Sequence, residues 1–216
     1  MITEQIIDIK KDMTEMCNAA LTILKKSIAT ITEGSPEGSA GLREMEDKIN
    51  FLEIVIENKC VQACARFQPE AGNLRRLLMY NKMITELERV GDLSVDIADS
   101  SEMIRTVLTR ETREIALKIS ADSTAMFAQS IDSFIDEDVE KAKMILQQDD
   151  AVDSEKNAAI DAVIALIKKK PDDAEYLFNL IKIIQKMERV ADHATNIAEE
   201  VIFMCEGTVT KHHYSE

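Results

Sequence analysis

The chain has 216 residues, of which 45% are hydrophobic and 31% are charged, a balance typical of a folded globular protein. Its 26 basic and 40 acidic residues give a formal charge of −14, which excludes nucleic acid as an expected direct partner, because the phosphate backbone would be repelled. No apolar run is long enough to cross a membrane, and the first ten residues lack the pattern of an export signal. We therefore expect a cytoplasmic protein without membrane insertion.

Few turn-forming residues interrupt the chain, and this predicts an all-α protein. Only 6 Gly and 3 Pro are present, whereas residues that favour helices are abundant. Breaks occur at Gly34 to Gly41, Phe67 to Asn73 and Lys168 to Asp173. In chain order, the spacing predicts helices near residues 2–32, 40–66, 70–106, 108–136, 138–168 and 172–205.

The last of these segments shows the helical spacing most clearly. Its apolar residues recur every three or four positions, with one slip, and so form a single seam along one face of a helix. The seam consists of Leu177, Leu180, Ile184, Met187, Ala191, Ala194, Ala198, Val201 and Cys205. Because its middle is entirely Ala, we expect the backbone of another helix to approach closely there.

The sequence repeats internally. ERVGDLSVDIAD, which begins at Glu88, matches ERVADHATNIAE, which begins at Glu188, at an offset of 100 residues. Upstream, EDKIN at residues 46–50 aligns with DDAVD at residues 149–153, at an offset of 103. Two segments repeated in the same order indicate duplication of a whole unit. We therefore predict two tandem three-helix up-down bundles, a first unit at residues 1–106 and a second unit at 107–216.

Acidic residues recur at a four-residue spacing in both units, and this spacing places them on one face of a helix. Since like charges at this spacing repel, their duplication suggests that a cation binds there. The candidate metal ligands are Glu46, Asn50, Glu88, Asp92 and Asp96 in the first unit, and Asp149, Asp153, Glu188, Asp192 and Asn196 in the second. Carboxylate oxygens suit Mg, Mn, Ca or Fe ions, and Zn less well.

The four cysteines carry no such pattern. A zinc site at Cys60 and Cys64 would need two more ligands nearby, and the only histidines are His193, His212 and His213. A chain of this length does not need disulfides to build a core. We therefore expect reduced, mostly packed thiols.

At these residues the sequence resembles the PhoU family of phosphate-uptake regulators. The resemblance extends over essentially the whole chain and includes the ERVGD and ERVAD segments, Gln68 and Pro69 followed by NLRRLL, and ADHATNIAEEVIFM. It implies a negative regulator of phosphate uptake and of phosphate-starvation signalling, without catalysis. It also implies contacts with the ATPase subunit of a phosphate ABC transporter and with a phosphate sensor histidine kinase. We expect a homodimer as well.

The resemblance also implies multinuclear metal clusters at an acidic pattern that occurs twice in each repeat. This pattern corresponds to four pairs of residues four positions apart: Glu46 and Asn50, Glu88 and Asp92, Asp149 and Asp153, and Glu188 and Asp192. Asn50 departs from it, because it stands in place of an acid. Asp96, which aligns with Asn196, could restore the missing charge, and we therefore expect the two sites to differ in affinity.

Two alternatives to the regulator remain. A carboxylate-bridged di-metal helical-bundle enzyme, or a metal-storage protein, would use Glu-x-x-His motifs that project into the bundle. The residues three positions before the histidines are Val190, Val209 and Thr210, which disfavours this class. A purely structural bundle would use its acids only for solubility. No catalytic triad, phosphate-cradling Gly loop or dinucleotide fingerprint is present, and we predict that the protein is not an enzyme.

Overall fold

The computed structural model describes residues 1–33, 38–104 and 108–208, and throughout these ranges the regular structure is helical, which confirms the all-α prediction. In chain order the helices are α1 (Ile2–Glu33), α2 (Gly38–Phe67), α3 (Ala71–Ile104), α4 (Arg110–Asp136), α5 (Val139–Leu146), α6 (Asp149–Lys169), the short 3₁₀ helix η1 (Pro171–Asp173) and α7 (Ala174–Glu206). No helix in the described ranges is both long and apolar enough to span a membrane.

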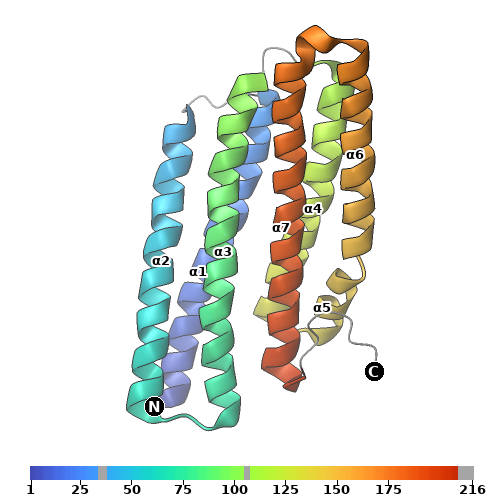
Figure 1. Cartoon of the computed structure of the whole chain (residues 1–216). Coiled ribbons are helices and arrows are strands. Elements are labelled where there is room, and N and C mark those ends of the chain that lie inside the picture. The colour runs from blue at the N-terminus through green and yellow to red at the C-terminus, as the bar shows by residue number, and fades with distance from the viewer. Residues whose placement is uncertain (34–37, 105–107, 209–216) are drawn as a thin grey trace.

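The helices form two bundles that stand side by side (Figure 1). In the first, α1, α2 and α3 pack on one another; in the second, α7 packs on α4, α5 and α6. The ends of α2, α3, α4 and α7 fall within a few residues of their predicted positions. The predicted unit boundary between residues 106 and 107 lies outside the described residues.

The prediction of one helix over residues 138–168 was wrong, because two helices, α5 and α6, occupy this segment. Asp138 caps α5 by accepting hydrogen bonds from the backbone N–H groups of Glu140 and Lys141. At the break, Gln148 N–H donates to the carbonyl of Ile145 at 3.0 Å. This hydrogen bond spans three residues, as in a 3₁₀ turn, instead of the four of an α-helix. Asp149 and Asp150 then begin α6, where acidic side chains favour a helix start. No Gly or Pro marks this break in the sequence.

The two bundles meet chiefly where α3 packs against α7, and α1 also contacts α4. The predicted seam of α7 is buried along its length, except that Cys205 is half-buried. On α3, Gly91 admits α2 closely: a Cβ atom at Gly91 would lie 3.2 Å from Ile49 Cδ1. Gly91 thus lies in close contact with α2, and the Ala residues in the middle of the α7 seam are buried.

An ion-pair cluster also joins the two bundles. Glu137 ends α4 in the left-handed backbone region, at φ 54°. Its carboxylate accepts hydrogen bonds from Arg76 of α3 at 2.6 and 3.0 Å and from Lys10 of α1 at 2.7 Å. The Arg76 hydrogen bonds, more than those of Lys10, lower the pKa of Glu137 to about 2. Glu137 thus ties the second bundle to two helices of the first.

All four cysteines are free, as predicted. Cys17 and Cys60 are buried, and Cys64 and Cys205 are half-buried. Burial raises the pKa of Cys17 and of Cys60 to about 12, so both are protonated and unreactive at neutral pH.

Candidate metal centres on the acidic helix faces

Four carboxylates gather where α2 lies against α3, and we call Glu46, Glu53, Glu88 and Asp92 the first acidic cluster. Burial, followed by the interaction with the neighbouring Asp92 carboxyl group, raises the pKa of Glu46. Burial, followed by the charges of Asp92 and Glu53, also raises the pKa of Glu88. The cluster thus holds more negative charge than its surroundings neutralise.

Asn50 lies on the same face of α2, one turn after Glu46. Its side-chain oxygen Oδ1 is buried and accepts no hydrogen bond from any described residue. A buried amide oxygen without a donor is costly in an apolar setting. Such an oxygen is also a good ligand for a hard cation, so Asn50 fits the metal-binding role predicted for it.

The sequence interpretation missed Glu53. Its pKa is raised by burial, then by the charge of Glu57 and less strongly by that of Asp92, while a hydrogen bond with Thr85 of α3 opposes the rise. Glu53 lies three residues after Asn50, and at the offset of 103 it aligns with Lys156. Extending the aligned segments by three residues would have revealed this exchange of an acid for a base.

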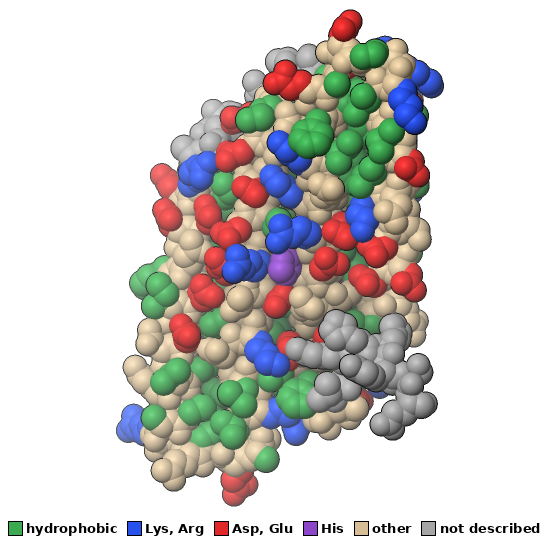
Figure 2. Space-filling model, viewed as in Figure 1, with side chains coloured by type: hydrophobic (Ala, Val, Ile, Leu, Met, Phe, Trp, Pro, Cys, Tyr) green, Lys and Arg blue, Asp and Glu red, His purple; other side chains and the backbone are tan. Residues whose placement is uncertain are grey.

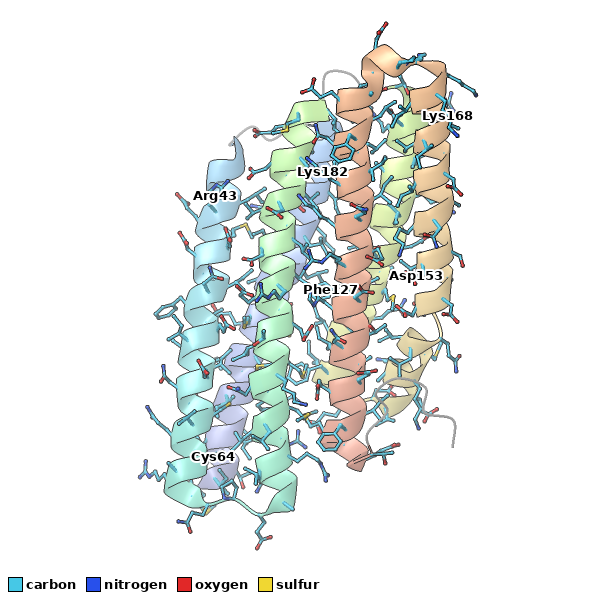
Figure 3. The ribbon with its side chains drawn as sticks, in the orientation of Figure 1. Arg43, Cys64, Phe127, Asp153, Lys168 and Lys182 are labelled. Atoms are coloured by element: carbon cyan, nitrogen blue, oxygen red, sulfur yellow. The ribbon has the colours of Figure 1, made fainter. Side chains whose placement is uncertain are left out.

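The second acidic cluster consists of Asp149 and Asp153 of α6 with Glu188 and Asp192 of α7. Burial raises the pKa of Asp192 to about 6, with the charges of Glu188, Asp149 and Asp153 adding to the effect in that order. Figure 3 labels Asp153 on α6, on the side where that helix lies next to α7. The structure therefore brings together the four predicted acids of this unit.

A lysine lies within the second cluster. Lys156 Nζ donates to Glu188 at 2.6 Å and to Asp153 at 3.0 Å, and its side chain is only 18% exposed. In the first cluster the nearest comparable cation is Arg89, which lies 3.6 Å from Glu88 and 3.9 Å from Asp92 and is 57% exposed. The second cluster therefore carries a fixed internal counter-ion, whereas the first has only a loose one.

The structure does not bring Asp96 and Asn196 into these clusters. Lys186 of α7 lies 3.6 Å from the Asp96 carboxylate and donates to the Asp96 carbonyl at 2.8 Å. Asn196 donates to Glu86 of α3 at 3.0 Å, and the same Glu86 oxygen lies 2.7 Å from His193 Nδ1. Both residues therefore lie at the contact between α3 and α7. In Figure 2, basic side chains and His lie between two groups of acidic ones.

As they stand, the clusters do not have the geometry of a finished metal site. Among the described residues, no three Asp, Glu, His or Cys side chains converge closely enough to hold an ion. The carboxylates nevertheless repel one another, and Asn50 Oδ1 lacks a donor. These features suit a cation that draws half-buried carboxylates together, and they fit the first cluster better than the second.

Comparison with known proteins places this arrangement in context. The PhoU domain family matches the chain twice, over residues 13–101 and 116–201. The PhoU homolog of Pseudomonas aeruginosa is 29% identical over 201 residues, covering 88% of this chain and 81% of that protein. The homolog of Aquifex aeolicus is 30% identical over 216 residues, covering 98% and 92% respectively. Both are described as phosphate-specific transport system accessory proteins.

Solved structures agree. The crystal structure of PhoU from Pseudomonas aeruginosa superposes with a TM-score of 0.92 at 25% identity, covering 96% of this chain and 100% of that one. A phosphate transport system regulatory protein from Streptococcus pneumoniae superposes with a TM-score of 0.88 at 21% identity, which supports the fold.

Proposed function

Because the chain belongs to the PhoU family, we propose that it is an accessory regulator of a phosphate transport system that acts by binding rather than by catalysis. Relatives that cover most of the chain are described as accessory proteins of phosphate-specific transport. Two halves built alike, each with a carboxylate cluster on its surface, suit a protein that binds cations and partners.

In finer detail, the proposal assigns a negative regulator of phosphate uptake and of phosphate-starvation signalling, located in the cytoplasm. Its partners would be the ATPase subunit of a phosphate ABC transporter and a phosphate sensor histidine kinase. A homodimer is part of the same proposal. The formal charge of −14 favours docking on basic regions of such partners.

The proposal also includes divalent or trivalent metal ions bound at the acidic clusters. The observation that carries it is the duplicated cluster, which lies between α2 and α3 in the first unit and between α6 and α7 in the second. Mg, Mn, Ca or Fe suit such oxygen ligands, and Zn suits them less well. Bound there, a metal would offset the carboxylate repulsion and clamp neighbouring helices, α2 to α3 and α6 to α7.

The two clusters should not bind equally. The first offers Glu46, Glu53, Glu88 and Asp92, and Asn50 lies one helical turn after Glu46. At the second, a cation must displace Lys156 from Glu188 and Asp153. We therefore expect the first cluster to have the higher affinity.

A thermal melt of chelator-stripped protein, with and without each metal, tests the metal proposal. An ion at 100 times its dissociation constant stabilises the fold by about 2.7 kcal/mol, which is a rise of about 5–11 °C for a chain of this size. The rise should shrink strongly in Asp92→Ala and less in Asp192→Ala. No shift with any ion would reject metal binding but leave the family assignment intact.

A cellular assay tests the regulator proposal separately. In a host lacking its own PhoU protein, the chain should lower expression of a reporter driven by a phosphate-starvation promoter in phosphate-rich medium. A helical-bundle protein from an unrelated family, expressed at the same level, serves as the control. Unchanged reporter expression, with the matching transporter and kinase supplied, would contradict the proposed role.

A further inference from the structure

The outer face of α2 carries an apolar seam that no described helix covers. Phe51, Ile54 and Val61 are 64%, 58% and 61% exposed. With Asn58 and Ala65 they alternate at spacings of three and four, and we call these five residues the outer seam of α2. The opposite face of the helix holds the buried core residues Ile49, Leu52, Ile56, Cys60 and Ala63. Thus α2 has two seams, and one of them faces solvent.

The bundle architecture does not require this outer seam. In the second unit, the aligned residues at the offset of 103 are Ser154, Asn157, Asp161, Ile164 and Lys168 of α6. Four of these five are polar or charged, yet α6 packs on α7 in a bundle of the same kind. The apolar seam therefore belongs to the first unit alone and needs an explanation other than folding.

The seam continues onto the neighbouring helix. Leu78 of α3 is 50% exposed and lies seven residues, or about two turns, before Thr85. Thr85 faces α2, since it hydrogen-bonds with Glu53. Figure 2 accordingly shows hydrophobic side chains gathered over the α2 and α3 part of the surface. From Phe51 to Ala65 the seam runs for about 20 Å, or two heptads.

The charges on its two flanks differ. On the side toward α1, Lys59 is paired with Asp8 and Asp12, and Lys48 is paired with Glu15. On the side toward α3, Glu57 is exposed and its charge raises the pKa of Glu53, whose charge in turn raises the pKa of Glu88. Arg89 partly offsets the charges of Glu53 and Glu88, but no described cation forms an ion pair with the exposed Glu57. Because the lysines on the other flank are already paired, the surface presents a row of apolar side chains beside the negative charge of Glu57.

We propose that the outer seam of α2 docks a basic amphipathic helix of a partner protein. Apolar residues of that helix lie on Phe51, Ile54 and Val61, and its Lys or Arg residues lie against Glu57 and Glu53, in the manner of a coiled-coil pair. This inference rests on the proposed function only in that the chain acts through protein contacts. It names the surface and the chemistry of the partner.

A second copy of the chain suits the seam less well. In an antiparallel pairing of two α2 helices, the flanking position of Glu57 meets its own equivalent, so that two glutamates face each other. Like charges in that position disfavour pairing, whereas a basic partner converts the same position into an attraction. Charge complementarity therefore favours a partner with basic residues beside its apolar stripe.

The test uses a fluorescein-labelled peptide of three heptads, with Leu at the core positions and Lys at the flanking positions. Anisotropy, recorded at physiological salt and in the presence of chelator, should show saturable binding of one peptide per chain. In Ile54→Ser/Val61→Ser the dissociation constant should rise at least tenfold. The matched control, Ile7→Ser/Met144→Ser, changes two equally exposed apolar residues on α1 and α5 and should bind as the wild type does.

Charge is tested on both sides of the contact. Glu57→Gln should weaken peptide binding several-fold, and a peptide with Glu in place of Lys should not bind. Equal peptide binding by the wild type and Ile54→Ser/Val61→Ser would overturn the proposal. It would mean that the lysines of the peptide bind nonspecifically to the negatively charged surface of the protein. A dimer that Ile54→Ser/Val61→Ser abolishes in sedimentation would overturn it too, by assigning the seam to a second copy.

The reporter assay separates this inference from the proposed function. Ile54→Ser/Val61→Ser should lose repression while keeping its melting temperature and metal response, and the control pair should keep repression. If the wild type itself fails to repress, the regulator proposal fails, whereas the peptide result still decides the seam. If Ile54→Ser/Val61→Ser represses fully, the seam is not the regulatory contact and the inference is wrong.

Discussion

At the scale of single residues, Lys156 sets the difference between the two acidic clusters. Its ammonium group bonds Glu188 and Asp153, and these bonds raise the pKa of Lys156. At the aligned position the first unit has Glu53. This residue thus reverses the charge at one position of a repeated site, which differs also at Asn50 and Asp153.

We predict that Lys156→Glu raises the affinity of the second cluster for Mn²⁺ or Mg²⁺ at least tenfold, because it removes a competing cation and adds a ligand. The same change should lower the stability of the metal-free protein, since five carboxylates then repel one another. Calorimetric titration in an Asp92→Ala background isolates the second cluster. Lys156→Gln, which only removes the charge, should give a smaller gain.

The raised pKa of Asp192 predicts a pH dependence of the metal-free protein. A carboxyl group whose folded pKa lies near 6, above its unfolded value near 4, binds protons more tightly when folded. Stability should therefore rise as the pH falls from 7 toward 5. Solvent reaches Asp192 and screens part of the repulsion, so the gain should be modest.

Urea unfolding at pH 7 and at pH 5 measures this dependence, and Asp192→Asn should reduce it. Saturating metal at pH 7 should also reduce it by offsetting the same repulsion. Identical pH dependence in the wild type and Asp192→Asn would show that another group is responsible.

Glu137 contributes a pH dependence of stability with the opposite sign. Its folded pKa of about 2 lies below its unfolded value, so its contribution is present above about pH 4 and is lost as the pH falls toward 2. At neutral pH, Glu137→Gln should destabilise the protein by about 2 kcal/mol, because charged hydrogen bonds to Arg76 and Lys10 are lost. Chemical denaturation measures the loss, and Arg110→Gln, which removes an exposed ion pair with Glu114, should change stability little.

At the scale of helices, the small residues of α7 decide how closely the two bundles pack. Ala194 is fully buried in the seam. Ala194→Leu should cost about 1–3 kcal/mol by overpacking, a loss of several degrees in melting temperature. Ala158→Leu makes the same change at an exposed position of α6 and should be nearly neutral. Equal melting temperatures for both variants would show that the helices around the seam can move apart to accommodate a larger side chain.

Helical spacing was enough to predict most of these elements. The seam of α7, the break at Lys168 to Asp173 and the repeat around Glu88 and Glu188 all express short-range preferences that sequence displays directly. The break between α5 and α6 lacks Gly or Pro, and it depends on a cap at Asp138 and a restart at Asp149. Such a break cannot be read from apolar spacing alone.

The candidate sites were less predictable, because they depend on which helix each face meets. Four-residue spacing located Glu88 and Asp92 but could not show that Asp96, one further turn on, lies near Lys186 of α7. Likewise, Asn196 donates a hydrogen bond to Glu86 of the other bundle. Each turn of four residues drifts by about 40° around the helix, so two turns suffice to leave one contact and enter another.

At the scale of the whole molecule, the two bundles should unfold together. The apolar contact between α3 and α7 and the Glu137 cluster both join them, so neither bundle is independent of the other. Scanning calorimetry should show one transition whose calorimetric and van't Hoff enthalpies agree. Two resolved transitions would show that the contact between the bundles is weaker than its burial suggests.

If metal binds at both acidic clusters, as proposed, their difference widens the range of ion concentration over which the protein is loaded. If Lys156 costs the second cluster about 1.4 kcal/mol of binding energy, its half-saturation point moves tenfold above that of the first. The protein would then fill over a wider span of ion concentration than two equal sites would, in a single shallow rise. The two clusters would in this way extend the range of ion concentration over which loading changes.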